Sequence, residues 1–326
     1  MGGFLTQLLP PSPTLTEKNL PSLVDKVFIV TGGNAGIGLE LVKILYSKGG
    51  TVYIASRSPT KVASAIEDIK ALHPTSTGYL KPLHLDLGDL STIPKCAETF
   101  LAQESRLDIL FNNAGISRQP AGTVSAQGHE IHMATNCIGP FLLTKLLLPI
   151  LLQTAKSAPK ASVRVVFSSS SIIEMASPPG GLSLAEQRPG NYSKDLNRNY
   201  SASKAGDWFL ASEFSKRYFR DAGIVSVAHH PGTLKTKSWD NVSWIMKGLF
   251  KPFFYDPNMG AYTALWCGFS VEVGVEDGER YAIPWGRWHP DPKKELLASL
   301  KTKEEGGTGL AGEFWAWCEE CTKEFA

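Results

Sequence analysis

Cysteines are few in this chain, and their number and spacing give no disulfide pattern. Five are present in 326 residues, an odd number spread along the whole length. That usage argues against a disulfide framework and favours a reducing compartment, so we expect a cytoplasmic protein. Cys318 and Cys321 form a C-E-E-C sequence near the C-terminus, with no further cysteine or histidine beside them. Because a zinc site needs four ligands, we expect two ordinary thiols in a terminal helix and no metal site.

Long apolar runs and an excess of one charge are also missing. No segment approaches the roughly 18 uninterrupted apolar residues of a membrane span, and the N-terminus lacks the basic leader of a signal peptide. Lys and Arg together number 33, against 31 for Asp and Glu. This balance offers no footprint for nucleic acid or for an acidic membrane surface, and it predicts a small-molecule partner instead.

What the chain does have is a regular alternation of short apolar runs and longer amphipathic segments. Seven runs have the composition of buried strands, at residues 26–30, 51–55, 83–85, 107–111, 163–167, 224–228 and 281–283. Helical spacing of apolar residues is found at 36–48, 59–72, 125–153 and 199–221. Strands that alternate with long helices predict βαβ units, and hence one doubly wound α/β domain around a parallel sheet.

We place this domain at residues 26–290, after an irregular N-terminal arm at 1–25 and before a helical tail at 291–326. Two segments interrupt the alternation: 172–198 is rich in Pro, Gly and Ser, and 234–255 is rich in aromatic residues. Long loops inside a compact domain are more often functional than idle, so both are predicted substrate loops. The second loop carries Trp239, Trp244, Met246, Phe250, Phe253 and Phe254. They suggest a largely apolar substrate, with ordinary packing or an oligomer contact as the alternative.

A glycine-rich turn follows the first strand and opens the first helix. It reads Thr31-Gly32-Gly33-Asn34-Ala35-Gly36-Ile37-Gly38, with the spacing G-x-x-x-G-x-G rather than G-x-G-x-x-G. Glycines allow a tight turn and a close approach of the backbone to a pyrophosphate, and the helix N-terminus points its free amides at the phosphates. The predicted dinucleotide-binding residues of this turn are Gly32, Asn34, Gly36, Ile37 and Gly38.

The end of the second strand predicts which dinucleotide binds. Enzymes that prefer NAD usually place Asp or Glu there to hold the ribose 2′-hydroxyl. The segment Ile54-Ala55-Ser56-Arg57-Ser58 contains no acid, and Arg57 can pair with the 2′-phosphate of NADPH. Asp86, just past the third strand, is predicted to bind the adenine amino group. The alternatives are a solvated arginine at the first position and a loop cap at the second.

Tyr200 and Lys204 are one helical turn apart in the predicted helix 199–221, so their side chains share one face. An unaided tyrosine has a pKa of about 10 and is a poor acid or base at neutral pH. A cation within several ångströms favours the phenolate and brings that pKa toward the working range. Because a Y-x-x-x-K pair is frequent by chance, its meaning depends on the motifs around it.

Four further motifs accompany this pair in order along the chain. They are TGGNAGIG at 31–38, Asn112-Asn113-Ala114-Gly115 after the fourth strand, a serine run ending the fifth, and Pro231-Gly232 after the sixth. Together they make residues 25–290 resemble the short-chain dehydrogenase/reductase family. The long insert before Tyr200 resembles retinol-dehydrogenase-like and WW-domain-oxidoreductase-like members, and the segment from Tyr281 to Arg287 resembles fungal members. The resemblance implies a Rossmann fold with a seven-stranded parallel sheet flanked by helices.

Carried over residue by residue, the resemblance also implies a nicotinamide cofactor and an Asn-Ser-Tyr-Lys catalytic group. Tyr200 would donate a proton to the carbonyl oxygen, while Lys204 lowers the pKa of that tyrosine and binds the nicotinamide ribose. Asn136 would hold a water that links Lys204 to solvent. Further cofactor contacts are implied at Asn113, Gly115, Pro231, Gly232 and Thr236, the last at the carboxamide.

The catalytic serine belongs to a run of four, from Ser168 to Ser171. Aligning residues 164–167 with the usual strand of the family places the carbonyl-polarising hydroxyl at Ser170. Side chains alternate along a strand, so Ser169 would face the other way if the strand continued. We therefore predict Ser170 and keep Ser169 as the alternative.

The sequence thus predicts a reductase that uses NADPH to reduce a ketone or aldehyde. Alcohol oxidation or imine reduction on the same fold is one alternative, and an NADPH-binding scaffold without catalysis is another. Because a pure binder does not need Tyr200 and Lys204, we favour the enzyme. The resemblance also implies homodimers or homotetramers, paired through the helices at 125–153 and 199–221.

Four of the seven histidines occur in two close pairs along the sequence. His230 stands where the family commonly has Asn, and because adjacent strand residues face opposite ways, at most one of His229 and His230 lines the pocket. His129 and His132, in the sequence H-E-I-H, have the wrong spacing for a zinc pair on a helix. We expect both of them on the surface.

Overall fold

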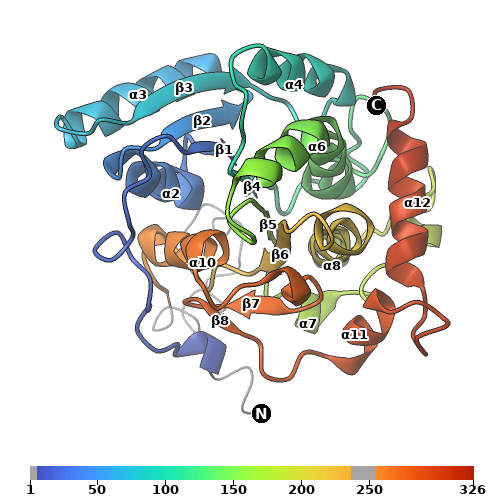
Figure 1. Ribbon diagram of the computed structural model, residues 1–326. Helices are drawn as coiled ribbons and strands as arrows, with labels where there is room; N and C mark the ends of the chain where they lie inside the picture. Colours follow the sequence, from blue (N-terminus) through green and yellow to red (C-terminus); the bar gives the residue numbers. More distant parts are fainter. Residues whose placement is uncertain (1–5, 236–253) are drawn as a thin grey trace.

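The computed structural model describes residues 6–235 and 254–326 of the chain. One eight-stranded sheet runs through its centre in the order β3-β2-β1-β4-β5-β6-β7-β8 (Figure 1). The strands are β1 (Val27–Thr31), β2 (Thr51–Ser56), β3 (Tyr79–His84), β4 (Ile109–Asn112), β5 (Arg164–Ser168), β6 (Val225–His229), β7 (Tyr281–Ile283) and β8 (Arg287–Trp288). Strands β1 to β7 are parallel, and β8 is antiparallel to β7. The predicted doubly wound α/β fold is confirmed.

The sheet has one strand more than the seven that the sequence predicted. The additional strand, β8, has only two residues, so no alternation of apolar and polar side chains could reveal it. β3 begins at Tyr79, several residues before the predicted run near Leu83. It is an edge strand in which Leu80 and Leu83 are buried while Tyr79 and Pro82 are exposed, and such a strand has no continuous apolar run.

Helices cover both faces of the sheet (Figure 1). On one face lie α2 (Gly36–Ser47), α3 (Pro59–Leu72) and α10 (Pro257–Phe269), whose buried residues join the same apolar cluster. On the other face lie α4 (Ile93–Leu101), α6 (Gly139–Ser157) and α8 (Leu196–Phe214). The shorter elements are η1 (Leu90–Thr92), α5 (Ile131–Met133), η2 (Ala134–Ile138), α7 (Ile173–Ala176), η3 (Leu184–Gln187), η4 (Ser215–Phe219), η7 (Val275–Asp277), α11 (Lys294–Leu300) and α12 (Leu310–Thr322). The layers are those of a sheet buried on both sides.

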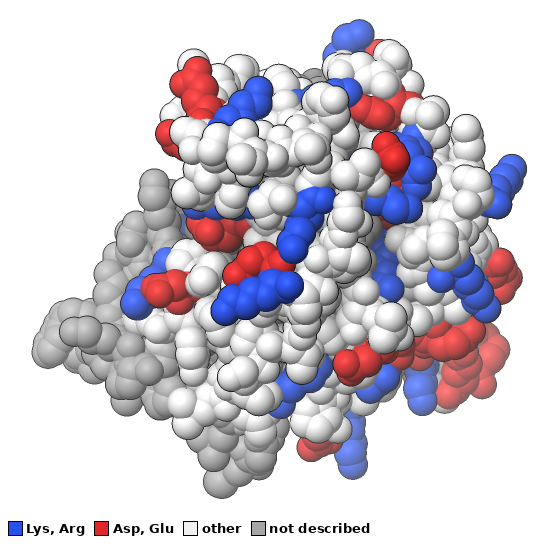
Figure 2. All heavy atoms as spheres, turned by 60° about the vertical axis from the view of Figure 1, so that its left-hand side comes forward, with Lys and Arg blue, Asp and Glu red and all other residues white. Residues whose placement is uncertain are grey.

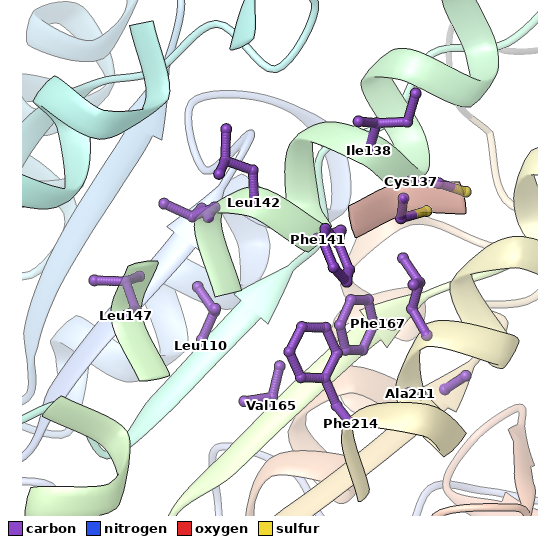
Figure 3. Close-up of a cluster of buried hydrophobic side chains, with 14 of the residues drawn as sticks. Leu110, Cys137, Ile138, Phe141, Leu142, Leu147, Val165, Phe167, Ala211 and Phe214 are labelled. Atoms are coloured by element: carbon purple, nitrogen blue, oxygen red, sulfur yellow. The ribbon is translucent and has the colours of Figure 1, made fainter. Parts of the chain in front are cut away.

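Figure 3 shows part of the core that lies between the sheet and the helices α6 and α8. Phe141 of α6, Phe167 of β5 and Phe214 of α8 meet there and are fully buried. The ring centroids of Phe141 and Phe214 are 5.7 Å apart, and those of Phe167 and Phe214 are 6.0 Å apart. This packing holds α8 firmly against β5, so that the two elements present their side chains in a fixed relation.

The long central helix differs from its predicted span of 125–153. Helical backbone begins at Ile131 with α5, passes through the π-helical turn η2 and continues as α6 to Ser157. It is long and apolar enough to cross a membrane, with a mean hydropathy of 1.6 in an 18-residue window, but 67% of that window is buried inside the fold. Its apolar character is that of a core helix between the sheet and its neighbours.

The described part of the N-terminal arm and the C-terminal tail both pack onto the predicted domain. Leu20 and Leu23 of the N-terminal arm join the core on the α2 side, and residues 6–8 are helical, so the described part of the arm is more ordered than predicted. In the tail, Phe314 and Trp315 of α12 join the core on the α8 side. The domain boundaries at 25 and 290 therefore remain predictions.

Two smaller expectations can be compared with the structure. Cys318 and Cys321 lie in α12 as free thiols, as expected. The segment 172–198, predicted as a long loop, holds the short helices α7 and η3, and α8 already begins at Leu196. Its Pro and Gly content hid these single turns, which are too short to show periodicity.

Candidate active site

The predicted site residues gather at one edge of the sheet, where the parallel strands end. Gly32 follows β1, Arg57 follows β2, Asn113 follows β4 and Ser170 lies just past β5. The strand order reverses between β1 and β4, which opens the position where doubly wound sheets bind their ligands. The fold therefore brings together residues that are far apart in the sequence.

The glycine-rich turn has the backbone that its sequence predicted. Gly32 and Gly36 have positive φ angles of 66° and 55°, which residues with a side chain rarely adopt. A Cβ on Gly36 would meet nothing within 4 Å, so the backbone there is open to a close-lying group. No side chain caps the N-terminus of α2. Its first amides are thus available to a phosphate.

Asn113 ties this turn to the end of β4. Its side-chain Nδ2 donates to the carbonyl oxygen of Thr31 at 2.9 Å, and its amide donates to the Thr31 hydroxyl at 3.0 Å. A Cβ on Gly38 would lie only 2.6 Å from that Nδ2, which explains why a glycine is needed there. Through these two hydrogen bonds, Asn113 holds the start of the glycine-rich turn against the end of β4.

The two residues predicted to select the cofactor lie at the same edge. Arg57 is exposed immediately after β2. Asp86 is half-buried, and its Oδ1 accepts a hydrogen bond of 2.9 Å from the amide of Gly88. That bond is the loop cap that the sequence left open as an alternative for Asp86. Binding of the adenine amino group by this carboxylate stays a prediction.

Tyr200 and Lys204 lie in the first turns of α8, over the end of β5. Tyr200 is half-buried, and its hydroxyl makes no hydrogen bond to any residue in 6–235 or 254–326. Lys204 is buried, and its Nζ donates to the carbonyl oxygen of Ser168 at 2.7 Å and to Oδ2 of Asp207 at 2.9 Å. The phenol is open to a ligand, while the ammonium is held in place.

The electrostatics of this pair are those of a buried cation between two acidic groups. Burial acts to lower the pKa of Lys204, but the charges of Asp207 and Tyr200 outweigh it and the pKa is raised. Burial raises the pKa of Asp207 to about 7, against the opposing effect of Lys204. Lys204 thus keeps its positive charge although its side chain is almost completely shielded from solvent.

Asn136 and Gly115 stand next to Lys204. The side chain of Asn136, in the turn η2, donates to the Ile116 carbonyl at 3.0 Å and to the Ser203 hydroxyl at 2.8 Å. A Cβ on Gly115 would lie 3.1 Å from Nζ of Lys204 and 3.2 Å from Oδ1 of Asn136. The absence of a side chain at Gly115 therefore leaves the space that these two residues share.

The serines after β5 differ in what their hydroxyls do. Ser168 Oγ is 3.1 Å from Nε2 of His229, and Ser169 Oγ donates to the backbone carbonyl of Lys204 at 2.6 Å. Both side chains are buried. Ser170 is half-buried, and its Oγ only accepts a long bond of 3.4 Å from the amide of Ile172. Of these three hydroxyls, that of Ser170 is the one whose proton is uncommitted.

Pro231 and Gly232 follow β6 at the same edge. Gly232 has a φ of 95°, its amide donates to Nδ1 of His230 at 3.1 Å, and a Cβ on it would lie 2.7 Å from the Trp285 ring. The next predicted contact, Thr236, lies outside the described residues, as do Trp239, Trp244, Met246, Phe250 and Phe253. The predicted aromatic substrate loop therefore stays a prediction.

One of the two histidines expected on the surface is placed differently from that expectation. His132 was expected on the surface but is 1% exposed, because its Nδ1 is 2.7 Å from Glu130 and its ring lies edge-on to Tyr200 at 6.2 Å. His129 is half-buried against Trp317. Helical spacing cannot separate an exposed face from one covered by a neighbouring element, which is why the expectation for His132 was wrong.

His229 and His230 are both buried, and burial lowers the pKa of each to about 3. His230 bonds through Nε2 to the side chain of Gln7 at 2.7 Å, and Gln7 also contacts His289 at 2.8 Å. Gln7, Glu130 and Asp207 are polar residues near the site that the sequence did not single out. Asp207 carried a signal, since it follows Lys204 at a spacing that places both on one helix face; Gln7 carried none.

Known proteins of similar sequence belong to one family. Residues 26–181 match the family described as short chain dehydrogenase. The chain is 47% identical to the short-chain dehydrogenase/reductase iacJ of Pestalotiopsis fici over 98% of this chain and 97% of that protein. It is 44% identical to a short-chain dehydrogenase/reductase of Phomopsis amygdali, over 98% of this chain and 96% of that protein.

Solved structures share the fold. A protein from Mycobacterium paratuberculosis described as uncharacterised superposes with a TM-score of 0.69 at 25% identity, covering 96% of this chain and 98% of that one. The NADPH-bound carbonyl reductase from chicken fatty liver superposes with a TM-score of 0.58 at 23% identity, covering 80% of this chain and 96% of that one.

Proposed function

The chain belongs to the short-chain dehydrogenase/reductase family of oxidoreductases, and we propose that it is an NADPH-dependent ketoreductase acting on a ketone or its secondary alcohol. One observation carries the proposal. The hydroxyl of Tyr200, which has no hydrogen-bond partner in residues 6–235 and 254–326, lies on the helix that also carries the buried Lys204. Lys204 in turn bonds to the carbonyl of Ser168, two residues before Ser170 and its weakly bonded hydroxyl. Carbonyl reduction needs these three groups: a proton donor, a cation and a hydrogen-bond donor to the carbonyl oxygen.

The residues at the carboxyl edge of the sheet fit a nicotinamide dinucleotide. The open backbone at Gly36 and the uncapped N-terminus of α2 suit a pyrophosphate. Arg57 supports NADPH over NADH, because its exposed guanidinium can pair with a 2′-phosphate and residues 54–58 hold no acid for a free ribose hydroxyl. When bound, the nicotinamide supplies the hydride in reduction or accepts it in oxidation.

The protein's own side chains would control the proton. In reduction, Ser170 donates a hydrogen bond to the carbonyl oxygen, and Tyr200 delivers its proton to the same oxygen. Lys204 stabilises the phenolate that remains. Two of its three ammonium hydrogens are directed at Ser168 and Asp207, which leaves the third for the nicotinamide ribose. In the oxidative direction the same residues act in reverse order.

A small organic molecule remains the proposed partner. On the face shown in Figure 2, Lys and Arg side chains are interspersed with Asp and Glu side chains rather than gathered in one basic area. Interspersed charges of this kind do not favour a polyanion such as nucleic acid. An apolar substrate is proposed on the aromatic composition of residues 239–254, and a cytoplasmic location on the use of cysteine.

The structure limits which surface a proposed homodimer or homotetramer could use to pair its copies. Every residue of α8 from Ser201 to Phe214 is buried within the single chain, with α11 and α12 among the elements packed against it. Pairing through α8 would require this cover to move away, which would expose Phe314 and Trp315. We therefore propose that any pairing of two copies uses a surface other than α8.

The test compares the wild type with Tyr200→Phe, following NADPH absorbance against a panel of aromatic and alicyclic ketones, with NADH in parallel. We expect the wild type to oxidise NADPH in preference to NADH. The variant should bind NADPH but lose most of its turnover, because it keeps the ring and loses the acidic proton.

Turnover retained by Tyr200→Phe would contradict the assignment of the proton donor. NADPH binding without turnover on any carbonyl would favour a binding role for the fold. Tyr192→Phe is a suitable control, since its hydroxyl bonds to the Gly128 carbonyl at 2.7 Å and is not part of the proposed group. It should leave turnover unchanged.

A further inference from the structure

Asp207 is an acidic residue in direct contact with the proposed proton-transfer group, and it belongs to none of the motifs that identified the site. It lies on α8, one turn beyond Lys204, and its Oδ2 accepts a hydrogen bond of 2.9 Å from the Lys204 ammonium. The two side chains are 6% and 4% exposed, so the ion pair is shielded from water. A carboxylate placed this deep is stable only if a cation accompanies it.

The pair has a fixed geometry. Nζ of Lys204 is held on one side by the Ser168 carbonyl at the end of β5 and on the other by Asp207. Phe209 and Phe214, farther along α8, are fully buried and keep the helix in register with the sheet. The ammonium is therefore directed by two acceptors, one from the strand and one from the helix.

In the part of the chain that the structure describes, two thiols, one phenol and one imidazole around the pair are neutral near physiological pH. Burial raises the pKa of Cys137 on η2, Tyr281 on β7 and Cys318 on α12 well above their usual values, and it lowers the pKa of His229 on β6 to about 3. Glu130 and Glu174 are each paired with a histidine instead, Glu130 with His132 and Glu174 with His289. Asp207, whose raised pKa of about 7 leaves it ionised in the alkaline range where a tyrosine titrates, is thus the acidic group in direct contact with Lys204.

We propose that Asp207 is a positioning residue of the hydride-transfer site, which holds the Lys204 ammonium and, as a buried anion, sets the pH at which Tyr200 exchanges its proton. The inference rests on the proposed function, since it gives Tyr200 the role of acid and base. The direction of the effect follows from charge alone. A nearby anion favours the protonated form of every neighbouring group, so removing it makes Lys204 and Tyr200 release their protons at lower pH.

The test substitutes Asp207→Asn, which removes the charge but keeps the shape and an oxygen that can accept from Lys204. Tyrosinate absorbance is titrated in the wild type and in the variant, each corrected by its own Tyr200→Phe counterpart, so that only Tyr200 contributes. We expect the midpoint to fall by about one pH unit. The pH profile of NADPH oxidation should move in the same direction by the same amount.

The matched control is Asp108→Asn. Asp108 is also a buried aspartate, paired with Lys26 and Arg106, but it lies before β4 at the opposite edge of the sheet. Its substitution should leave the Tyr200 midpoint unchanged even if the protein becomes less stable. Asp207→Ser, which removes the charge and the acceptor, should lower the midpoint at least as far as Asp207→Asn.

The outcomes separate this inference from the proposed function. A folded Asp207→Asn protein with the wild-type midpoint overturns the role of Asp207. Failure of both Asp207 variants to fold, where Asp108→Asn folds, also overturns it in favour of a structural role. A shifted midpoint in a protein that reduces no carbonyl would support Asp207 and contradict the ketoreductase, because the tyrosinate signal does not depend on turnover.

Discussion

The hydroxyl of Ser169 donates a hydrogen bond of 2.6 Å to the backbone carbonyl of Lys204. This bond joins the end of β5 to the first turns of α8, and it engages the only proton that the hydroxyl can donate. The neighbouring Ser170 hydroxyl has no such acceptor among residues 6–235 and 254–326. The two serines that the sequence could not separate therefore differ in their hydrogen bonding, which supports the proposed role of Ser170 toward the substrate.

Substitution of each serine by alanine should reveal this difference. Ser170→Ala is expected to lower kcat by about 10²- to 10³-fold with an unchanged Tm, as is typical when a donor to a developing oxyanion is removed. Ser169→Ala should lower the free energy of unfolding by about 0.5–1.5 kcal/mol, because the Lys204 carbonyl, which lies inside α8, loses its side-chain donor. Steady-state kinetics and urea denaturation of both variants check this. A larger loss of kcat in Ser169→Ala would reverse the assignment.

Arg57→Ala tests the proposed choice of cofactor. A charge-assisted contact of this kind contributes about 1.5–3 kcal/mol, so the Kd for NADPH should rise by about ten- to a hundredfold. The Kd for NADH should not change, because NADH has no 2′-phosphate. Fluorescence titration with both dinucleotides measures this. Lys70→Ala, which removes an exposed cation in the last turn of α3, is the control and should leave both constants unchanged.

His230 should make the protein sensitive to acid. Burial lowers its pKa to about 3, whereas a histidine in the unfolded chain has a pKa of about 6.5. Between these values the unfolded state binds a proton that the folded state does not, so stability is complete above about pH 6.5 and falls as the pH decreases toward 3. His230→Asn should reduce this slope by about 1.4 kcal/mol per pH unit.

Denaturant unfolding at a series of pH values between 7 and 4 measures that slope, in the wild type and in His230→Asn. His84→Asn, at an exposed position in β3, serves as the matched control and should keep the wild-type slope. An equal slope in His230→Asn and the wild type would mean that His230 takes up its proton in the folded protein as readily as in the unfolded chain.

The C-terminal helix should contribute strongly to stability. Trp315 of α12 is 1% exposed, and its ring lies 4.8 Å from that of Phe141 and 4.7 Å from that of Phe214. Trp315→Ala is expected to lower the free energy of unfolding by about 3–5 kcal/mol, since it leaves a cavity between α6, α8 and α12. Trp317→Ala, at a half-buried position of the same helix, should cost less. Urea denaturation of both variants compares them, and equal losses would contradict a core role specific to Trp315.

The sequence by itself determined the order of the elements and the prediction of which residues form the site. Apolar runs that alternate with amphipathic segments reveal buried strands and their crossover helices, because periodicity is a local property. For the same reason the glycine turn at 32–38 and the helical spacing of Tyr200 and Lys204 are evident from the residue order alone. They depend on residues that are neighbours along the chain.

Only the tertiary structure decided what depends on distant residues. The burial of His132, the commitment of Ser169 to Lys204, and the contact of Gln7 with His230 each join residues that are remote in the sequence. Local sequence patterns do not show which side chains a neighbouring element will cover, or which of them will donate a hydrogen bond to it. Asp207 stands between the two cases: its spacing from Lys204 is local, but its effect on the site comes from burial, which required the whole fold.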